Sequence, residues 1–137
     1  QRTHHEPITP QTEIYLADTM GELGVMYRRA DLVLMGGSLL PHGGQNPLEP
    51  AQLGLPIVVG PHMHNFSTML TVLQEADAVE TVTDASLLYS HVATLLNDAP
   101  LRERRGAHAQ RAVQMHRGAS TQIAASILAI LDPKSLP

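Results

Sequence analysis

A fifteen-residue stretch, GGSLLPHGGQNPLEP at positions 36–50, constrains the fold of this chain more than any other feature. Its four glycines and three prolines exclude the middle of a helix or a strand. The stretch lies between two apolar runs, DLVLM (31–35) and PIVVG (56–60). Because a connection of about 2–6 residues is usual between such elements, a long glycine-rich loop at this point is typical of a functional site.

The apolar runs are continuous rather than alternating, which is typical of strands buried on both faces of a parallel sheet. We predict strands over 12–17, 31–37, 56–60 and 78–82. We predict helices over 21–30, 47–53, 66–76, 84–96, 100–116 and 119–131. This alternation predicts an α/β, Rossmann-like fold with helices on both faces of the sheet, in which ligands bind at the carboxyl ends of the strands.

Residues with strong capping preferences mark the expected ends of these helices. Asp18 and Asp84 are predicted N-caps, and Gly54 is the predicted C-cap of the helix over 47–53. Asn46, followed by proline and then Glu49, has the spacing of a capping box. Free N–H groups at this helix start favour an anion site in the loop, although the same residues could simply form a turn and a cap.

Composition argues against several classes of function. The net charge of -4 and the pI of about 6.0 provide no overall positive field for nucleic acid or anionic lipid. The chain has no cysteine, which excludes disulfides and thiolate metal sites. No run reaches the roughly 18 apolar residues of a membrane helix, so we expect a soluble chain. Four arginines are expected to form a basic face on one helix: Arg102, Arg104, Arg105 and Arg111. Such a face is usually solvated, and the alternative is contact with another domain or with anionic headgroups.

Three histidines near the loops raise the question of a metal site. His62 and His64 are two positions apart, and His42 lies in the glycine-rich stretch. Histidine is the commonest metal ligand, but no aspartate or glutamate lies close to these three in the sequence. The dinucleotide motif G-x-G-x-x-G is also absent. We therefore expect neither a metal ion nor a cofactor.

Three motifs in order resemble the 3-deoxy-D-manno-octulosonic acid (Kdo) transferases, which add Kdo to the lipid A precursor. They are DTMGEL (18–23), GGSLLPHGGQNPLEP (36–50) and GPHMHNF (60–66). The resemblance implies the C-terminal, donor-binding half of a GT-B glycosyltransferase, whose two Rossmann-like domains face each other across a cleft. It implies a polar lead-in from a truncated chain over 1–11, a nucleotide-sugar binding domain over 12–131 and a tail over 132–137.

The resemblance also implies the partners and the location of the complete enzyme. The donor is CMP-Kdo, and the lipid A precursor binds to an N-terminal domain that also holds the catalytic base and the membrane anchor. The chain is therefore expected to have no catalytic residue and to be inactive alone. The whole enzyme would act in lipopolysaccharide biosynthesis at the cytoplasmic face of the bacterial inner membrane. Two alternatives stay open, a GT-B enzyme that uses a UDP-linked sugar and a non-catalytic nucleotide-binding module.

The family motif assigns donor-binding roles to residues of the glycine-rich stretch. Glu49 would hold the ribose hydroxyls of cytidine. Backbone N–H groups would surround the phosphate, from Gly43, Gly44, Gln45 and Asn46. The Ser38 hydroxyl would donate to the phosphate or to the sugar carboxylate, or else cap a turn. The family commonly has histidine at the position of Gln45, and glutamine cannot carry a proton at neutral pH, which argues against an acid role there.

Two further segments are expected at the same edge of the sheet. Near the cytosine or the phosphate the resemblance places Thr19, Met20, Gly21 and Glu22. The alternative for these residues is a helix cap with acidic side chains that complement the helix dipole. Lining the donor pocket it places Gly60, Pro61 and His62.

Overall fold

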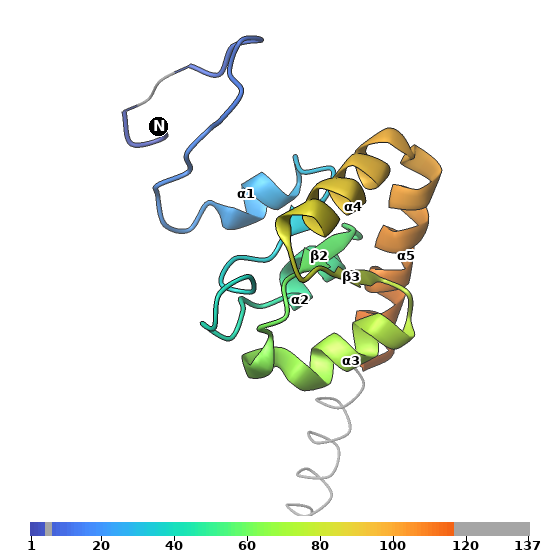
Figure 1. Ribbon diagram of the computed structural model, residues 1–137. Helices are drawn as coiled ribbons and strands as arrows, with labels where there is room; N and C mark the ends of the chain where they lie inside the picture. The colour runs from blue at the N-terminus through green and yellow to red at the C-terminus, as the bar shows by residue number, and fades with distance from the viewer. Residues whose placement is uncertain (5–6, 117–137) are drawn as a thin grey trace, which may run out of the picture. The chain divides into compact units, whose positions relative to one another are not determined.

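A three-stranded parallel sheet in the order β1-β2-β3 is the centre of the larger of two units into which the chain divides (Figure 1). The structure, a computed structural model, describes residues 1–4 and 7–116. The smaller unit comprises residues 1–30 and contains one short helix, α1 (Leu23–Tyr27). The larger unit begins at Asp31. The helix predicted over 119–131 lies outside the described residues.

The strands are short and run in parallel register. They are β1 (Val33–Leu34), β2 (Ile57–Val59) and β3 (Val79–Thr81). Val33 pairs with Ile57, and Ile57 in turn pairs with Val79. The central strand β2 is fully buried, as its apolar run predicts. The predicted α/β class with a parallel sheet is therefore confirmed.

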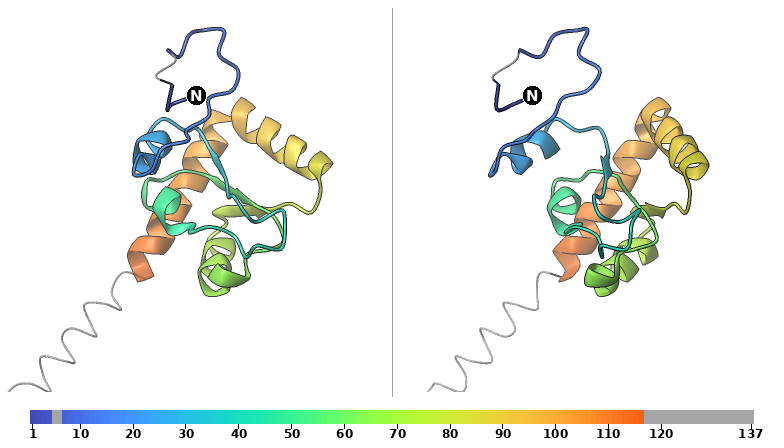
Figure 2. Two further views of the ribbon diagram at one scale, coloured as in Figure 1. Left: turned by 90° about the vertical axis from the view of Figure 1, so that its left-hand side faces the viewer. Right: turned by 60° about the vertical axis from the view of Figure 1, so that its left-hand side comes forward.

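Helices cover both faces of this sheet. Three of them contribute to the cluster that contains Ile57 and Val59, namely α2 (Leu48–Gln52), α3 (Ser67–Glu75) and α5 (Ala99–His116). Val58 points the other way and packs with Leu95 of α4 (Ala85–Asn97). Figures 1 and 2 show α3 and α4 on opposite sides of the sheet. Since successive side chains of a strand point to opposite faces of the sheet, the single apolar run of β2 contributes to the hydrophobic clusters on both faces.

The N-terminal elements differ from the prediction. Residues 12–17 form no strand, and Asp18 is not an N-cap: its carboxylate accepts a hydrogen bond from the Thr3 N–H at 2.8 Å. Helix α1 begins only at Leu23, without a side-chain cap. A six-residue apolar run forms a strand only when a neighbouring strand pairs with it. The pattern of apolar residues in the sequence does not show whether such a partner exists.

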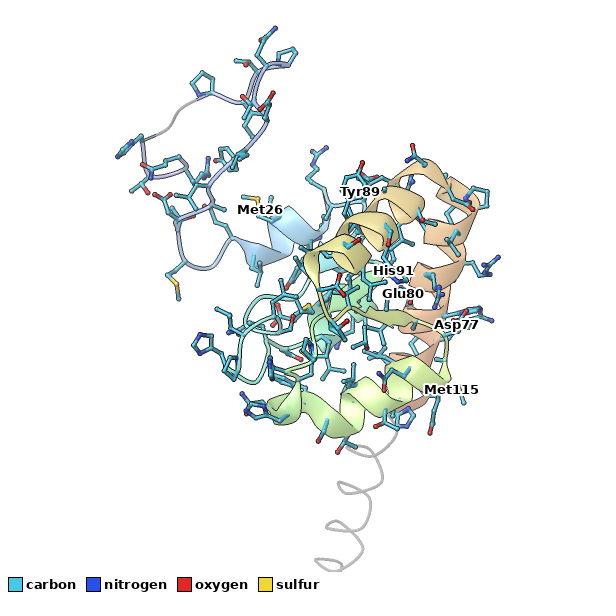
Figure 3. The ribbon with its side chains drawn as sticks, viewed as in Figure 1. Met26, Asp77, Glu80, Tyr89, His91 and Met115 are labelled. Atoms are coloured by element: carbon cyan, nitrogen blue, oxygen red, sulfur yellow. The ribbon has the colours of Figure 1, made fainter. Side chains whose placement is uncertain are left out.

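The predicted basic face of α5 is partly wrong. Arg105 has a side chain only 16% exposed, and its guanidinium binds the carboxylates of Asp77 and Glu80 beside the start of β3. Arg102 donates to the carbonyls of Leu95 and Leu96, each at 2.7 Å, and so caps the end of α4. Figure 3 shows Asp77, Glu80 and His91 beside α5, on the side of the larger unit away from residues 36–47. These arginines are structural because they join α5 to its neighbours.

Helix α5 touches the end of α2 through two glycines. Gly54 adopts a left-handed φ of +71° directly after Leu53, the C-cap of α2, and so ends the helix as predicted. A Cβ on Gly106 would lie 1.9 Å from the Gly54 carbonyl oxygen. The Gln110 side-chain amide donates to the Gln52 carbonyl at 3.0 Å, close to the same contact. Only glycine at position 106 allows this approach.

We expect the substitution Gly106→Ala to destabilise the chain, although alanine is the better helix former. The added methyl group has to displace backbone, and overpacking of this kind costs about 1–3 kcal/mol. Urea unfolding followed by circular dichroism measures the loss. The control is Gly24→Ala in α1, where a Cβ meets no atom closer than 3.9 Å. An equal or higher unfolding midpoint for Gly106→Ala would show that the helices do not approach in this way.

Candidate functional site

The candidate site is formed by two loops that follow neighbouring strands. Residues 36–47, here called the glycine loop, follow β1, and residues 60–65, the Gly60 loop, follow β2. Because β1 and β2 are parallel, both loops leave the sheet at the same edge. That edge is where ligands bind in sheets of this class.

Ser38 joins the two loops. Its side chain is completely buried, and its hydroxyl donates to the Met35 carbonyl at 2.5 Å and accepts from the Gly60 N–H at 2.8 Å. Its own carbonyl accepts from the His62 N–H at 2.9 Å. A hydroxyl has one proton, and this one is already donated. The geometry therefore favours turn capping by Ser38 over direct contact with a ligand.

Gly43 and Gly44 lie against the Gly60 loop. Both have left-handed φ angles, +90° and +76°. A Cβ at Gly43 would lie 2.2 Å from the Asn65 side-chain nitrogen, and one at Gly44 would lie 2.2 Å from the Met63 sulfur. At these two positions the backbone of the glycine loop approaches the Gly60 loop so closely that a residue with a Cβ would clash.

The glycine loop leaves several backbone donors free. The Gly44 N–H is used, because it donates to the Gly37 carbonyl at 3.0 Å. The N–H groups of Gly43, Gln45 and Asn46 donate to none of the described residues. Gln45 is exposed and Gly43 is buried. Three of the four predicted phosphate donors therefore have no hydrogen-bond partner among the described residues.

The start of α2 is only partly the predicted capping box. The Asn46 carboxamide oxygen accepts from the Leu48 N–H at 3.1 Å, so Asn46 caps the helix as predicted. The reciprocal bond from Glu49 does not form, and the exposed Glu49 carboxylate makes no hydrogen bond or ion pair with any described residue. Glu49 is therefore free to accept from a ligand.

Two hollows lie beside β1, and Leu34 lines both of them. One of about 220 Å³ lies beside the glycine loop and is lined by residues 34–37, Leu39, Leu40 and His42. A larger one of about 430 Å³ lies between β1 and α4, lined by aliphatic side chains and Tyr89. The larger hollow has no cluster of polar donors that could hold an anion. The glycine loop is the better candidate for a nucleotide site.

The DTMGEL segment belongs to the smaller unit, so its predicted proximity to the glycine loop stays a prediction. Within that unit the Glu22 carboxylate accepts from Arg2 Nε at 3.0 Å and from Arg2 Nη2 at 2.7 Å. The Thr19 hydroxyl also donates to it. Hydrogen bonds from Arg2 and Thr19 lower the pKa of Glu22 from 4.5 to about 2. Met20 is exposed and Gly21 adopts a left-handed φ of +83°.

The remaining predicted residues belong to the Gly60 loop. The Gly60 N–H is bound to Ser38, Pro61 is exposed and His62 is half-buried. His42 and His64 are exposed. The described part of the chain contains no group of three or more side chains that could hold a metal ion. Nor does any helix within it have the length and apolar character that a bilayer span requires.

Comparison with curated proteins links the chain to one group of enzymes. It is 38% identical over 120 residues to the 3-deoxy-D-manno-octulosonic acid transferase of Haemophilus influenzae, and 32% identical over 111 residues to that of Bordetella pertussis. These alignments cover 87% and 81% of the chain but only 28% and 26% of the relatives. The chain thus spans about a quarter of their length. No protein-family model matches it.

A solved structure gives the same result. The chain is similar to the crystal structure of the C-terminal CMP-Kdo binding domain of WaaA from Acinetobacter baumannii, with a TM-score of 0.78 and 36% sequence identity. The match covers 82% of this chain and 59% of that one. The resemblance to Kdo transferases that the motifs predict is therefore confirmed. These matches do not favour a UDP-sugar enzyme or a non-catalytic module.

We expect Ser38→Ala to lower stability by about 1–3 kcal/mol, because it leaves the Met35 carbonyl and the Gly60 N–H buried without a partner. Urea unfolding measures this loss. The control is Ser90→Ala, since the Ser90 hydroxyl donates to the Leu87 carbonyl at 2.9 Å at an exposed position. Its expected effect lies within about 0.5 kcal/mol. Similar losses in both variants would contradict a special role for Ser38.

We expect Arg2→Ala to raise the pKa of Glu22 from about 2 toward its usual 4.5. A carboxylate whose pKa is lowered by folding stabilises the folded unit at pH values above its unfolded-state pKa. That contribution to stability is lost as the pH falls toward the folded-state pKa. The contacts of Arg2 with Glu22 should therefore weaken between about pH 4.5 and 2. Carboxyl chemical shifts during a pH titration report this, with Arg29→Ala as the control. An unchanged Glu22 titration in Arg2→Ala would exclude the ion pair.

Proposed function

We propose that this chain is the nucleotide-sugar binding domain of a glycosyltransferase that transfers Kdo from CMP-Kdo to a lipid A precursor in lipopolysaccharide biosynthesis. The observation that carries the proposal is the glycine loop at the carboxyl end of β1, with three N–H groups and the Glu49 carboxylate unpartnered among the described residues. Similarity to a CMP-Kdo binding domain supports CMP-Kdo as the donor.

The loop supplies two kinds of contact for such a donor. The N–H groups of Gly43, Gln45 and Asn46 are neutral donors for the phosphate of CMP. Glu49 lies three residues beyond Asn46, and its carboxylate accepts from the two ribose hydroxyls. The Gly60 loop contributes Gly60, Pro61 and His62 to the same pocket. For Thr19, Met20, Gly21 and Glu22, a role toward the cytosine or the phosphate rests on the family resemblance alone.

During transfer, negative charge develops on the departing CMP phosphate. Loop N–H groups that are already oriented toward that phosphate stabilise the charge without reorganising, which lowers the barrier to transfer. The attacking lipid hydroxyl is activated from a separate acceptor domain of the full enzyme. This chain therefore binds the donor and stabilises the leaving group, and by itself it does not catalyse transfer.

The complete enzyme would combine this domain with an N-terminal acceptor domain that holds the catalytic base and contacts the membrane. It would act at the cytoplasmic face of the bacterial inner membrane, where both CMP-Kdo and the lipid acceptor are accessible. On this proposal residues 12–131 are the donor-binding domain, with 1–11 and 132–137 as flanking segments.

We expect CMP to bind the chain more tightly than UMP, and Glu49→Ala to weaken CMP binding roughly 10- to 100-fold, the range for hydrogen bonds to a charged group. Amide chemical shifts of residues 36–49 during a titration with each nucleotide measure this. Glu75→Ala is the matched control, because Glu75 is also exposed and its side chain makes no hydrogen bond or ion pair with the described residues. Equal binding of CMP by both variants would remove Glu49 from the site. No shift with either nucleotide would overturn the proposed function for the chain alone.

A further inference from the structure

Asn65 is the last residue of the Gly60 loop, and both its backbone and its side chain contact the glycine loop. We propose that Asn65 is a positioning residue, which orients the peptide between His42 and Gly43 so that the Gly43 N–H faces the donor phosphate. This inference rests on the proposed function. It concerns a residue that acts through the glycine loop and does not itself touch the nucleotide.

Two hydrogen bonds join Asn65 to the glycine loop. Its backbone N–H donates to the Gly43 carbonyl at 3.2 Å, and its side-chain amide donates to the His42 carbonyl at 3.4 Å. The two carbonyls belong to consecutive peptide groups. Asn65 thus holds two adjacent peptides of the glycine loop from one side.

Packing reinforces these hydrogen bonds. A Cβ at Gly43 would lie 2.2, 2.6 and 2.8 Å from the nitrogen, carbon and oxygen of the Asn65 carboxamide. The carboxamide therefore lies directly against the Gly43 α-carbon. The left-handed φ of +90° at Gly43 is a conformation that glycine adopts without strain. The position of this peptide is fixed by contact as well as by hydrogen bonds.

The planarity of the peptide group then determines where the N–H points. In a trans peptide the carbonyl and the N–H point in opposite directions, and no peptide bond among the described residues is cis. Because the His42 carbonyl faces Asn65, the Gly43 N–H points away from Asn65, and it donates to no described residue.

The next peptide is held on both sides. Its carbonyl, from Gly43, accepts from the Asn65 N–H, and its N–H, from Gly44, donates to the Gly37 carbonyl at 3.0 Å. This peptide cannot rotate without breaking one of the two bonds. The Gly43 N–H belongs to the peptide between His42 and Gly43. The carbonyl of that peptide, from His42, is held by the Asn65 side chain, and the peptide that follows it is held by two hydrogen bonds.

The test compares CMP with cytidine, which lacks the phosphate, as ligands of the unaltered chain and of Asn65→Leu. Leucine has the branched shape of asparagine without the donor or any charge. Since Asn65 is exposed, we expect only the loss of its one side-chain hydrogen bond, which lowers stability by about 0.5–1.5 kcal/mol. CMP affinity should fall roughly two- to tenfold, the range for one hydrogen bond. Cytidine affinity should change by less than about twofold, because no phosphate contact is involved.

Asn97→Leu is the matched control. The Asn97 side-chain amide also donates to a backbone carbonyl, that of Ala93 at 2.8 Å, but at the end of α4. It should leave both affinities unchanged. An equal loss of CMP and cytidine binding in Asn65→Leu, or no loss of either, overturns the positioning role while the proposed function stands. If CMP does not bind the unaltered chain, the proposed function fails and this inference with it.

Discussion

The buried hydroxyl of Ser38 is the interaction on which the candidate site depends. It accepts from the Gly60 N–H and donates to the Met35 carbonyl, so one side chain joins the segments that follow β1 and β2. Gly60 has to be glycine for this junction, because a Cβ there would lie 2.3 Å from the Ser38 carbonyl oxygen. With the two loops fixed to each other, their free N–H groups keep one arrangement, which is what recognition of a small anion requires.

The unpartnered N–H groups of the glycine loop are neutral hydrogen-bond donors. The glycine loop contains no lysine or arginine, and the chain as a whole is acidic with a net charge of -4. The chain therefore has little long-range attraction for an anion, and the proposed donor site depends on backbone N–H groups at close range. Such donors work only when the backbone is held still. This explains why many polar groups of the glycine loop form hydrogen bonds within the two loops.

Local signals predicted several elements correctly because their causes lie within a few residues. Gly54 ends α2 in a left-handed conformation, and Asp84 caps α4 by accepting from the Leu87 N–H at 2.9 Å. Prediction failed where a distant partner decided the outcome. Asp18 accepts from Thr3 instead of capping α1, and Arg105 binds Asp77 and Glu80 instead of solvent. Nothing in the local sequence around Asp18 or Arg105 specifies those partners.

The sequence by itself determined the fold class, the position of the loop and the relationship to Kdo transferases, because these follow from apolar runs, glycine and proline positions and motif order. Tertiary structure alone decided which polar groups remain free. Ser38 and Gly60 are 22 positions apart, and Asn65 lies 23 positions beyond His42. Whether a hydroxyl or an N–H can reach a ligand depends on whether such a distant residue already occupies it. That competition is settled only when the loops meet at the edge of the sheet.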